Sequence, residues 1–271
     1  MKRFTLLAAL LLCLLVQSQA QCGGKGMKAL ELKDYAAAWT AFEDCLKEDA
    51  GDISANFGIS RLYGMDPAKK DPQKALDYLV LAEAGWAKLD EKGRAKYEKF
   101  GVTTAELESR RSRIEASLLE VAKTNNTVAG FDAFLIQFPN SVSATVCRNY
   151  RNDLAYKLAL EEGSVEALDN YLTTYPDAEN VKDVAKVRDE RATAETLKAN
   201  TEEAMVNFLK RYPAAIQAPQ IQQRLNAVAF ENAKTANTAE AFRSYVDRFP
   251  DSVFITQAKE KLEWLETNGQ K

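Results

Sequence analysis

The sequence Tyr-Val-Asp-Arg-Phe-Pro-Asp-Ser at residues 245–252 is the last of four copies of one pattern. The proline of this pattern recurs every 37 residues, and each copy carries one aromatic residue directly before the proline and another five positions before it. The positions that define the repeat are Phe134, Phe138, Pro139, Tyr171, Tyr175, Pro176, Phe208, Tyr212, Pro213, Tyr245, Phe249 and Pro250. A period of this length indicates one supersecondary unit that is stacked on copies of itself.

Each copy begins with a short helix. Apolar residues eight, five, four and one positions before the proline have the spacing of one helix face. A hydroxyl twelve positions before the proline predicts the N-cap, because it can accept from free backbone N–H groups in the first turn. These residues are Thr127, Ser164, Thr201 and Thr238, and each follows Asn126, Gly163, Asn200 or Asn237. Since Asn and Gly tolerate the left-handed conformation, they predict the end of the preceding helix.

A longer helix follows each proline. Eight positions after the proline lie Cys147, Val184, Ile221 and Ala258, which predict one core position. Cys147 is therefore interpreted as a packing residue and not as a nucleophile. The predicted unit has a helix of about 11 residues and one of about 18, and neither can bury its apolar face without a neighbouring unit.

The repeated pattern resembles the tetratricopeptide-like repeats of bacterial envelope proteins, including the outer-membrane lipoprotein type. In the N-terminal part, Tyr35, Ala38, Phe42 and Leu46 resemble the helix-packing positions of a tetratricopeptide repeat, and residues 55–86 resemble a Sel1-like repeat. The resemblance implies an all-α fold, an α-solenoid of antiparallel helix pairs in a right-handed superhelix, with about 12–14 helices after the signal peptide. It also implies binding of a protein or peptide on a superhelical groove, and no catalytic residues.

The first twenty residues are predicted to be a signal peptide. Lys2 and Arg3 precede an apolar run at residues 6–16, and Ser18 and Ala20 suit a cleavage site after Ala20. The run is too short to span a membrane. Domains are therefore expected at residues 1–20 (signal peptide), 21–123 (the N-terminal helical region) and 124–271 (four repeats with a C-terminal capping helix).

Cys22 leaves two forms of the exported protein open. A lipoprotein signal also ends before a cysteine, and lipidation of Cys22 would give peripheral membrane association. Gln19 and Gln21 do not fit that signal, so a soluble form is favoured, either periplasmic or associated with the outer membrane. In the tetratricopeptide register Cys22 opens the first helix and Cys45 lies near the end of the antiparallel second one, which makes a disulfide possible. Unpaired thiols are the alternative.

Residues 91–101 are predicted to be a charged connection containing Gly93 and Gly101. Thr103 and Glu106 then predict a capping box for a helix from about residue 104 to residue 123. Arg110, Arg111 and Arg113 lie on this helix and admit two interpretations, an anion site or a solvated face. The solvated face is favoured, because acidic residues surround them at Glu106, Glu108 and Glu115.

Composition limits the function. The chain has no histidine and a net charge of −3, so the commonest general base is missing and no basic excess suggests nucleic acid. No catalytic, metal-binding or cofactor-binding residues are predicted, and the chain is not expected to be an enzyme. The expected function is an exported protein–protein interaction scaffold. The alternative is a glycan- or peptidoglycan-binding accessory protein that uses Trp39, Trp86 or Trp264, although the helical spacing of all three suits a core.

Overall fold

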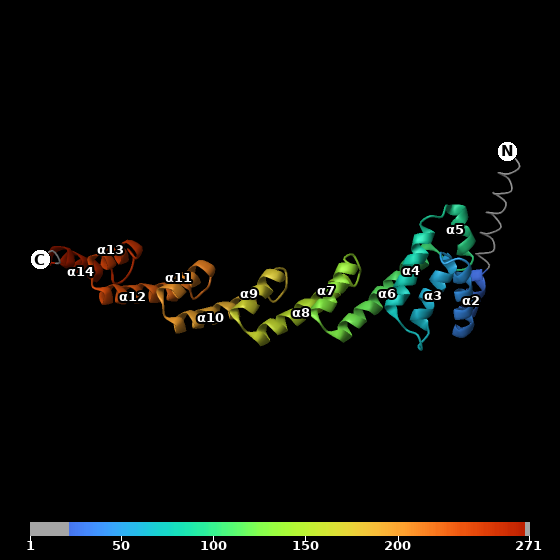
Figure 1. Cartoon of the computed structure of the whole chain (residues 1–271), viewed down its shortest axis with the longest axis horizontal. Helices are drawn as coiled ribbons and strands as arrows, with labels where there is room; N and C mark the ends of the chain where they lie inside the picture. The colour runs from blue at the N-terminus through green and yellow to red at the C-terminus, as the bar shows by residue number, and fades with distance from the viewer. Residues whose placement is uncertain (1–21, 269–271) are drawn as a thin grey trace, which may run out of the picture. The chain divides into compact units, whose positions relative to one another are not determined.

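The computed structural model describes residues 22–268, and all regular secondary structure in this part of the chain is α-helical (Figure 1). The helices pack in sequential pairs, so the predicted all-α architecture of helix pairs is confirmed. The predicted signal peptide lies outside the described residues. Two compact units divide the chain, Met1–Arg151 and Asn152–Lys271. This division falls within the helix Ala144–Glu162 of the first repeat, whereas the expected boundary between residues 123 and 124 lies within the helix Thr104–Asn125.

The first unit starts with a helical stretch over residues 22–31. Its further helices are α2 (Tyr35–Glu48), α3 (Ile53–Met65), α4 (Pro72–Trp86), α5 (Glu91–Glu98), α6 (Thr104–Asn125), α7 (Val128–Gln137) and the first part of α8 (Ala144–Glu162). Helix α3 packs against α2 and α4, and α4 also packs against α6. These contacts build a core that reaches from α2 to α6.

Close helix approach in this core depends on glycine. The ring of Phe42 in α2 is fully buried. A Cβ atom added at Gly26 would lie 2.4 Å from this ring, and one added at Gly58 of α3 would lie 2.1 Å from it. Only glycine therefore leaves room for the phenyl ring at both positions, and the ring fills the space between two neighbouring helices.

The structure corrects the prediction for residues 91–101. Instead of an irregular connection, Glu91–Glu98 form helix α5. Asp90 caps this helix by accepting from the backbone N–H of Gly93 at 2.7 Å. Tyr97 is buried, which attaches the otherwise hydrophilic helix to the core. The burial of the Tyr97 ring thus explains why this charged segment packs as a helix and not as a loop.

The second unit contains the end of α8 and six further helices among its described residues. Its helices are α9 (Val165–Thr174), α10 (Val181–Ala199), α11 (Glu202–Arg211), α12 (Ala218–Ala236), α13 (Ala239–Arg248) and α14 (Ile255–Asn268). Each short helix has 10 residues, and α10 and α12 have 19 each, close to the predicted lengths. The short helices pack against the longer helices that follow them, and α10 and α12 also contact the next short helix. Neighbouring repeats therefore share one core.

The predicted boundaries of the short helices are confirmed. In each of the four repeats the expected hydroxyl is the N-cap and accepts from a backbone N–H three residues later, at 3.0–3.2 Å. The residues before these caps have positive φ angles between 47° and 64°, in the left-handed region; they are Asn126, Gly163, Asn200 and Asn237. At each of these four boundaries, a pair of adjacent residues, Asn or Gly followed by Ser or Thr, therefore ends one helix and begins the short helix.

The predicted core position eight residues after each proline is also confirmed. Cys147, Val184, Ile221 and Ala258 are all completely buried. Burial raises the pKa of the Cys147 thiol, and its Sγ donates to the carbonyl of Phe131 at 3.5 Å. These surroundings keep the sulfur protonated and support a packing role for Cys147.

Asp169 of α9 connects the second repeat to the third. One carboxylate oxygen accepts from Arg188 at 2.8 Å, and the other accepts from Arg211 at 2.7 Å and from the Tyr212 hydroxyl at 2.8 Å. Burial, together with the hydrogen bond to Asp169, raises the pKa of Tyr212 to about 12. The contact between these repeats is therefore polar as well as apolar.

One buried tyrosine has a hydroxyl group without a partner. In the last repeat the Tyr245 hydroxyl bonds with the Ser252 hydroxyl at 2.5 Å. In the second repeat the corresponding pair is Tyr171 and Ala178, and the buried Tyr171 hydroxyl has no hydrogen bond. An unsatisfied buried hydroxyl costs about 1–3 kcal/mol. The Tyr171 hydroxyl has no partner because Ala178 stands where the last repeat has Ser252.

We expect Ala178→Ser to raise the free energy of unfolding by about 1 kcal/mol, because the new hydroxyl reaches the position that Ser252 occupies opposite Tyr245. Urea unfolding of both proteins measures the difference. Ala215→Ser is the matched control, since Phe208 stands opposite it and has no hydroxyl. An equal gain in both variants would show that the serine acts locally and not through Tyr171.

Candidate interaction surface

The turn after each proline exposes one side chain. Three positions after the proline, Val142, Ile216 and Val253 are 85%, 86% and 86% exposed. The second repeat has Glu179 there, which is also exposed. The preceding residue is small and packs inward in the later copies, at Ala178, Ala215 and Ser252. The fold therefore holds this position in solvent whatever residue occupies it, and three copies use it for an apolar residue.

The first repeat extends this exposed position into a row of three residues. Val142, Val146 and Tyr150 follow one another at intervals of four residues and are 85%, 47% and 43% exposed. Side chains at this spacing lie on one side of a helix. These three residues, on α8 and the turn before it, are called the apolar stripe below.

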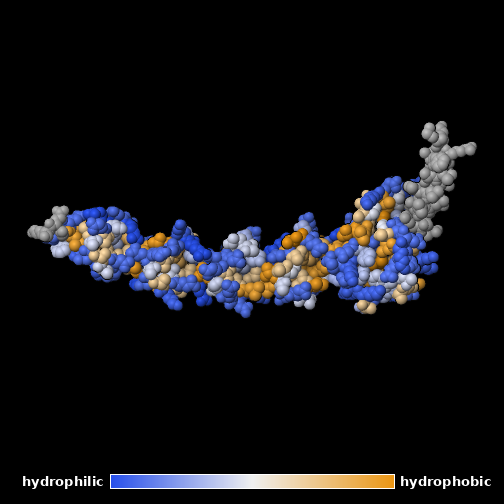
Figure 2. Space-filling model, viewed as in Figure 1, coloured by the Kyte–Doolittle hydropathy of each residue, from blue (hydrophilic) through white to orange (hydrophobic). Residues whose placement is uncertain are grey.

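The other repeats do not continue the stripe. The corresponding residues are Glu179, Asp183 and Val187 in the second repeat, Ile216, Gln220 and Arg224 in the third, and Val253, Gln257 and Lys261 in the fourth. Figure 2 shows apolar residues on the surface of both units within a mainly hydrophilic exterior. The stripe thus belongs to the first repeat alone, and it distinguishes that copy from the others.

Neighbouring side chains fix the ring of Tyr150. It stacks on Phe131, with 6.1 Å between the ring centroids. The ammonium group of Lys123 lies 5.0 Å from the centre of the Tyr150 ring and is paired with Glu120 at 2.8 Å. A ring restrained in this way loses little conformational entropy when a partner covers it, which favours binding.

The aromatic residues that define the repeat pack inward, whereas its four prolines are exposed. The inner aromatic rings, at Phe134, Tyr171, Phe208 and Tyr245, are all buried. The sequence did not indicate the stripe, because the position three residues after the proline is apolar in three of the four copies, as a core position would be. Only the inward packing of its neighbour shows that it faces solvent.

The three tryptophans have different surroundings. Trp39 and Trp86 are buried, and their indole N–H groups donate to Asp66 and Thr104, each at 3.1 Å. Trp264 is 54% exposed, which corrects the expectation that all three belong to a core. The Lys261 ammonium group lies 4.2 Å from the centre of the Trp264 ring. Only one tryptophan could therefore stack on a sugar.

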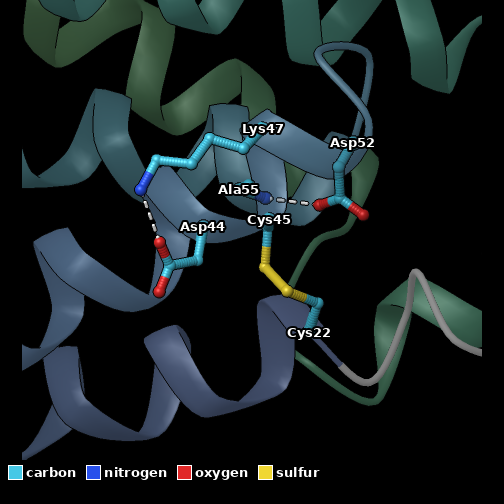
Figure 3. The surroundings of a disulfide bond; sticks show 6 residues. All are labelled: Cys22, Asp44, Cys45, Lys47, Asp52 and Ala55. Carbon is cyan, nitrogen blue, oxygen red and sulfur yellow. Dashed lines mark hydrogen bonds and ion pairs between the residues drawn. A yellow bond between two sulfur atoms is a disulfide. The ribbon is translucent and has the colours of Figure 1, made fainter.

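Cys22 and Cys45 form a disulfide, with 5.7 Å between their Cα atoms (Figure 3). The bond joins the start of the helical stretch at residues 22–31 to α2, near its end. A sulfur atom in a disulfide cannot also carry a thioether-linked lipid. The oxidised form shown by the structure and a lipidated Cys22 are therefore mutually exclusive.

Two further classes of site are absent from residues 22–268. No helix there is long and apolar enough to cross a membrane. No group of three or more His, Cys, Asp or Glu side chains is placed to hold a metal ion in this part of the chain. Comparison with protein-family models finds no match, and comparison with curated protein sequences finds none.

Proposed function

We propose that this chain is an exported scaffold of the bacterial envelope that binds a partner protein on the apolar stripe. The exposed row of Val142, Val146 and Tyr150 carries the proposal, because exposed apolar residues that lie together favour contact with another protein. Apolar residues four apart suit a partner segment with an apolar face of its own, such as an amphipathic helix. A helical repeat fold supports this role, since it presents a long surface on a rigid core.

Two features support export. The segment at residues 1–20 has the charge and apolar run of a signal peptide. The Cys22–Cys45 disulfide suits an oxidising compartment outside the cytoplasm, where such bonds persist. A periplasmic or outer-membrane-associated protein fits both features. The tetratricopeptide-like class is part of the same proposal and rests on the repeated pattern and the helix pairs.

Crosslinking in envelope extract tests the proposed function. We expect Val142→Glu to reduce recovery of the main partner about tenfold, because the variant places a charge within the covered apolar surface. Val253→Glu is the matched control, with the same residue, the same repeat position and nearly the same exposure in a copy without a stripe. Equal recovery with both variants, or no partner in repeated crosslinking, would contradict binding at the stripe.

The exposed side chain of Trp264 favours a second candidate function. An indole ring in solvent can stack on a sugar, so a glycan- or peptidoglycan-binding role stays a candidate. Co-sedimentation with purified peptidoglycan distinguishes the two functions. Saturable binding that is lost in Trp264→Ala and kept in Val142→Glu would replace the scaffold proposal with this one.

A further inference from the structure

A second feature of the first unit is a cavity of about 270 Å³ between the end of α3, the segment leading into α4, and α6. Six of the side chains around it decide its chemistry: Tyr63, Lys70, Pro72, Arg110, Arg113 and Ile114. Three of these are cationic and three are apolar or aromatic. The cavity is called the basic pocket below.

The basic pocket contains positive charge without a balancing carboxylate. No Asp or Glu is among the residues that line it. Within residues 22–268, Arg110, Arg113 and Lys70 form no ion pair, whereas the neighbouring Arg111 pairs with Glu83 and Glu115. Of these three arginines, Arg113 is exposed, as expected for a solvated face, whereas Arg111 is half-buried in its ion pairs. Arg110 is half-buried at the pocket.

Arg110 is fixed in position by Ser60 of α3. Its Nε donates to the Ser60 hydroxyl at 3.3 Å, and its Nη2 donates to the Ser60 carbonyl. The Ser60 hydroxyl donates in turn to the carbonyl of Ala75 at 2.7 Å. A guanidinium group has five N–H donors. The donors that Ser60 does not use have no hydrogen-bond acceptor among the described residues and remain for a ligand in the pocket.

The backbone of α3 leaves space for this guanidinium group. A Cβ atom added at Gly64 would lie 2.6 Å from Nη2 of Arg110 and 2.7 Å from Nη1. Any side chain at residue 64 would displace the cation. Glycine here therefore serves the placement of Arg110, since the φ angle of Gly64 is not in the left-handed region.

The electrostatics of the pocket favour an anion. Burial is the main cause that lowers the pKa of Arg110 to about 10, and the charges of Arg113 and Arg61 act in the same direction. The group is still protonated at neutral pH, but its charge is disfavoured by its surroundings. An anion in the pocket would remove this unfavourable interaction, and Arg groups match the two oxygens of a carboxylate or phosphoryl group in bidentate geometry.

We propose that the basic pocket binds an oxyanion, a carboxylate or phosphoryl group, that belongs to a ligand with an apolar part. Tyr63, Pro72 and Ile114 provide walls for that apolar part. A second cavity of about 380 Å³ shares Lys70, Pro72 and Ser117 with the basic pocket and adds the exposed Val121, so there is room for a longer ligand. A purely structural role accounts for the bonds between Arg110 and Ser60, but it does not explain two further cations beside them.

Titration calorimetry on the full oxidised chain at constant ionic strength tests this proposal. The probes are inorganic phosphate, N-acetylleucine, and N-acetylleucinamide, which has the same apolar part and no charge. We expect at least one of the two anions to bind saturably and the amide not to bind. Arg113→Gln and Lys70→Gln should each weaken binding about tenfold, since each removes one charge-assisted contact. Both residues are exposed, so these variants should fold.

Arg111→Gln is the matched control, because it removes the same charge from the same helix outside the basic pocket, and we expect unchanged affinity. Binding of phosphate alone identifies a phosphoryl ligand, and binding of N-acetylleucine alone identifies a carboxylate ligand. Lack of saturation with both anions overturns the proposal, as does equal weakening by Arg111→Gln and Arg113→Gln. The proposal does not depend on the scaffold function, and Val142→Glu should leave anion affinity unchanged whether or not a partner protein binds.

Discussion

Cys22→Ser should lower the free energy of unfolding of the first unit by about 3 kcal/mol. The disulfide closes a loop between residues separated by 23 positions in the sequence. Without the bond, the unfolded chain gains the conformational entropy that this loop restricts. The helical stretch at residues 22–31 also loses its covalent attachment to α2, although it keeps its contact with Phe42 through Gly26. Urea unfolding followed by the fluorescence of Trp39 and Trp86, both buried in this unit, measures the loss.

Reduction provides the control for this prediction. Dithiothreitol should lower the stability of the wild type by the same amount and leave Cys22→Ser unchanged, because Cys147 is a free cysteine. A wild-type protein that is insensitive to dithiothreitol would contradict the prediction. Such a result on protein purified from the envelope would favour the lipidated form of Cys22, in which no disulfide can exist.

Features that depend on neighbours in the sequence could be predicted. Thr201 and Asn200 form their helix boundary from residues within a few positions of each other, and the structure has this boundary as expected. The pairing of Cys22 with Cys45 depended on more, namely the antiparallel arrangement of two adjacent helices. Because those helices follow one another directly, the resemblance to a helix-pair repeat was enough to place both ends together.

Features that depend on distant residues could not be predicted. Arg110 lies among acidic residues in the sequence, and its hydrogen bonds are to Ser60, which is 50 positions away. Tyr97 in a charged segment gives no sign that it reaches the core. The exposure of the apolar stripe could not be predicted for another reason. Val142 is apolar in the sequence, and the packing of a turn decides which of its residues face solvent. Packing in the folded chain, and not local propensity, therefore determines both candidate binding surfaces.

The same unit should show a pH dependence due to Asp52, the N-cap of α3. Only 2% of this residue is exposed. One carboxylate oxygen accepts from the N–H of Ala55 at 2.7 Å (Figure 3), and the other is buried without a hydrogen bond. Burial is the main cause that raises the pKa of Asp52 to about 6, and the charge of Asp49 adds to it, while the Ala55 N–H acts in the opposite direction.

A raised pKa means that the folded state binds the proton more tightly than the unfolded state. The stabilisation that the tightly bound proton gives the folded state is complete when the pH is below the ordinary carboxyl pKa of about 3.9. It is lost as the pH rises through the pKa of the folded state. From a pKa near 3.9 to one near 6, the full change is about 3 kcal/mol. We therefore expect the stability of the wild type relative to Asp52→Asn to fall by about 2 kcal/mol between pH 4 and pH 7.5.

Asp52→Asn isolates this effect because Asn is as good an N-cap as Asp and carries no charge. Urea unfolding of both proteins across the pH range gives the difference, from which the titration of all other groups cancels. Asp90→Asn is the matched control for removal of a capping carboxylate, since Asp90 caps α5 with the same hydrogen bond at 2.7 Å but lies in solvent. A difference between wild type and Asp52→Asn that does not change with pH would show that the buried carboxylate is solvated in the folded protein. The sign of the change is the sharper test, because a capping carboxylate in solvent contributes more stability as it ionises, whereas a buried one contributes less.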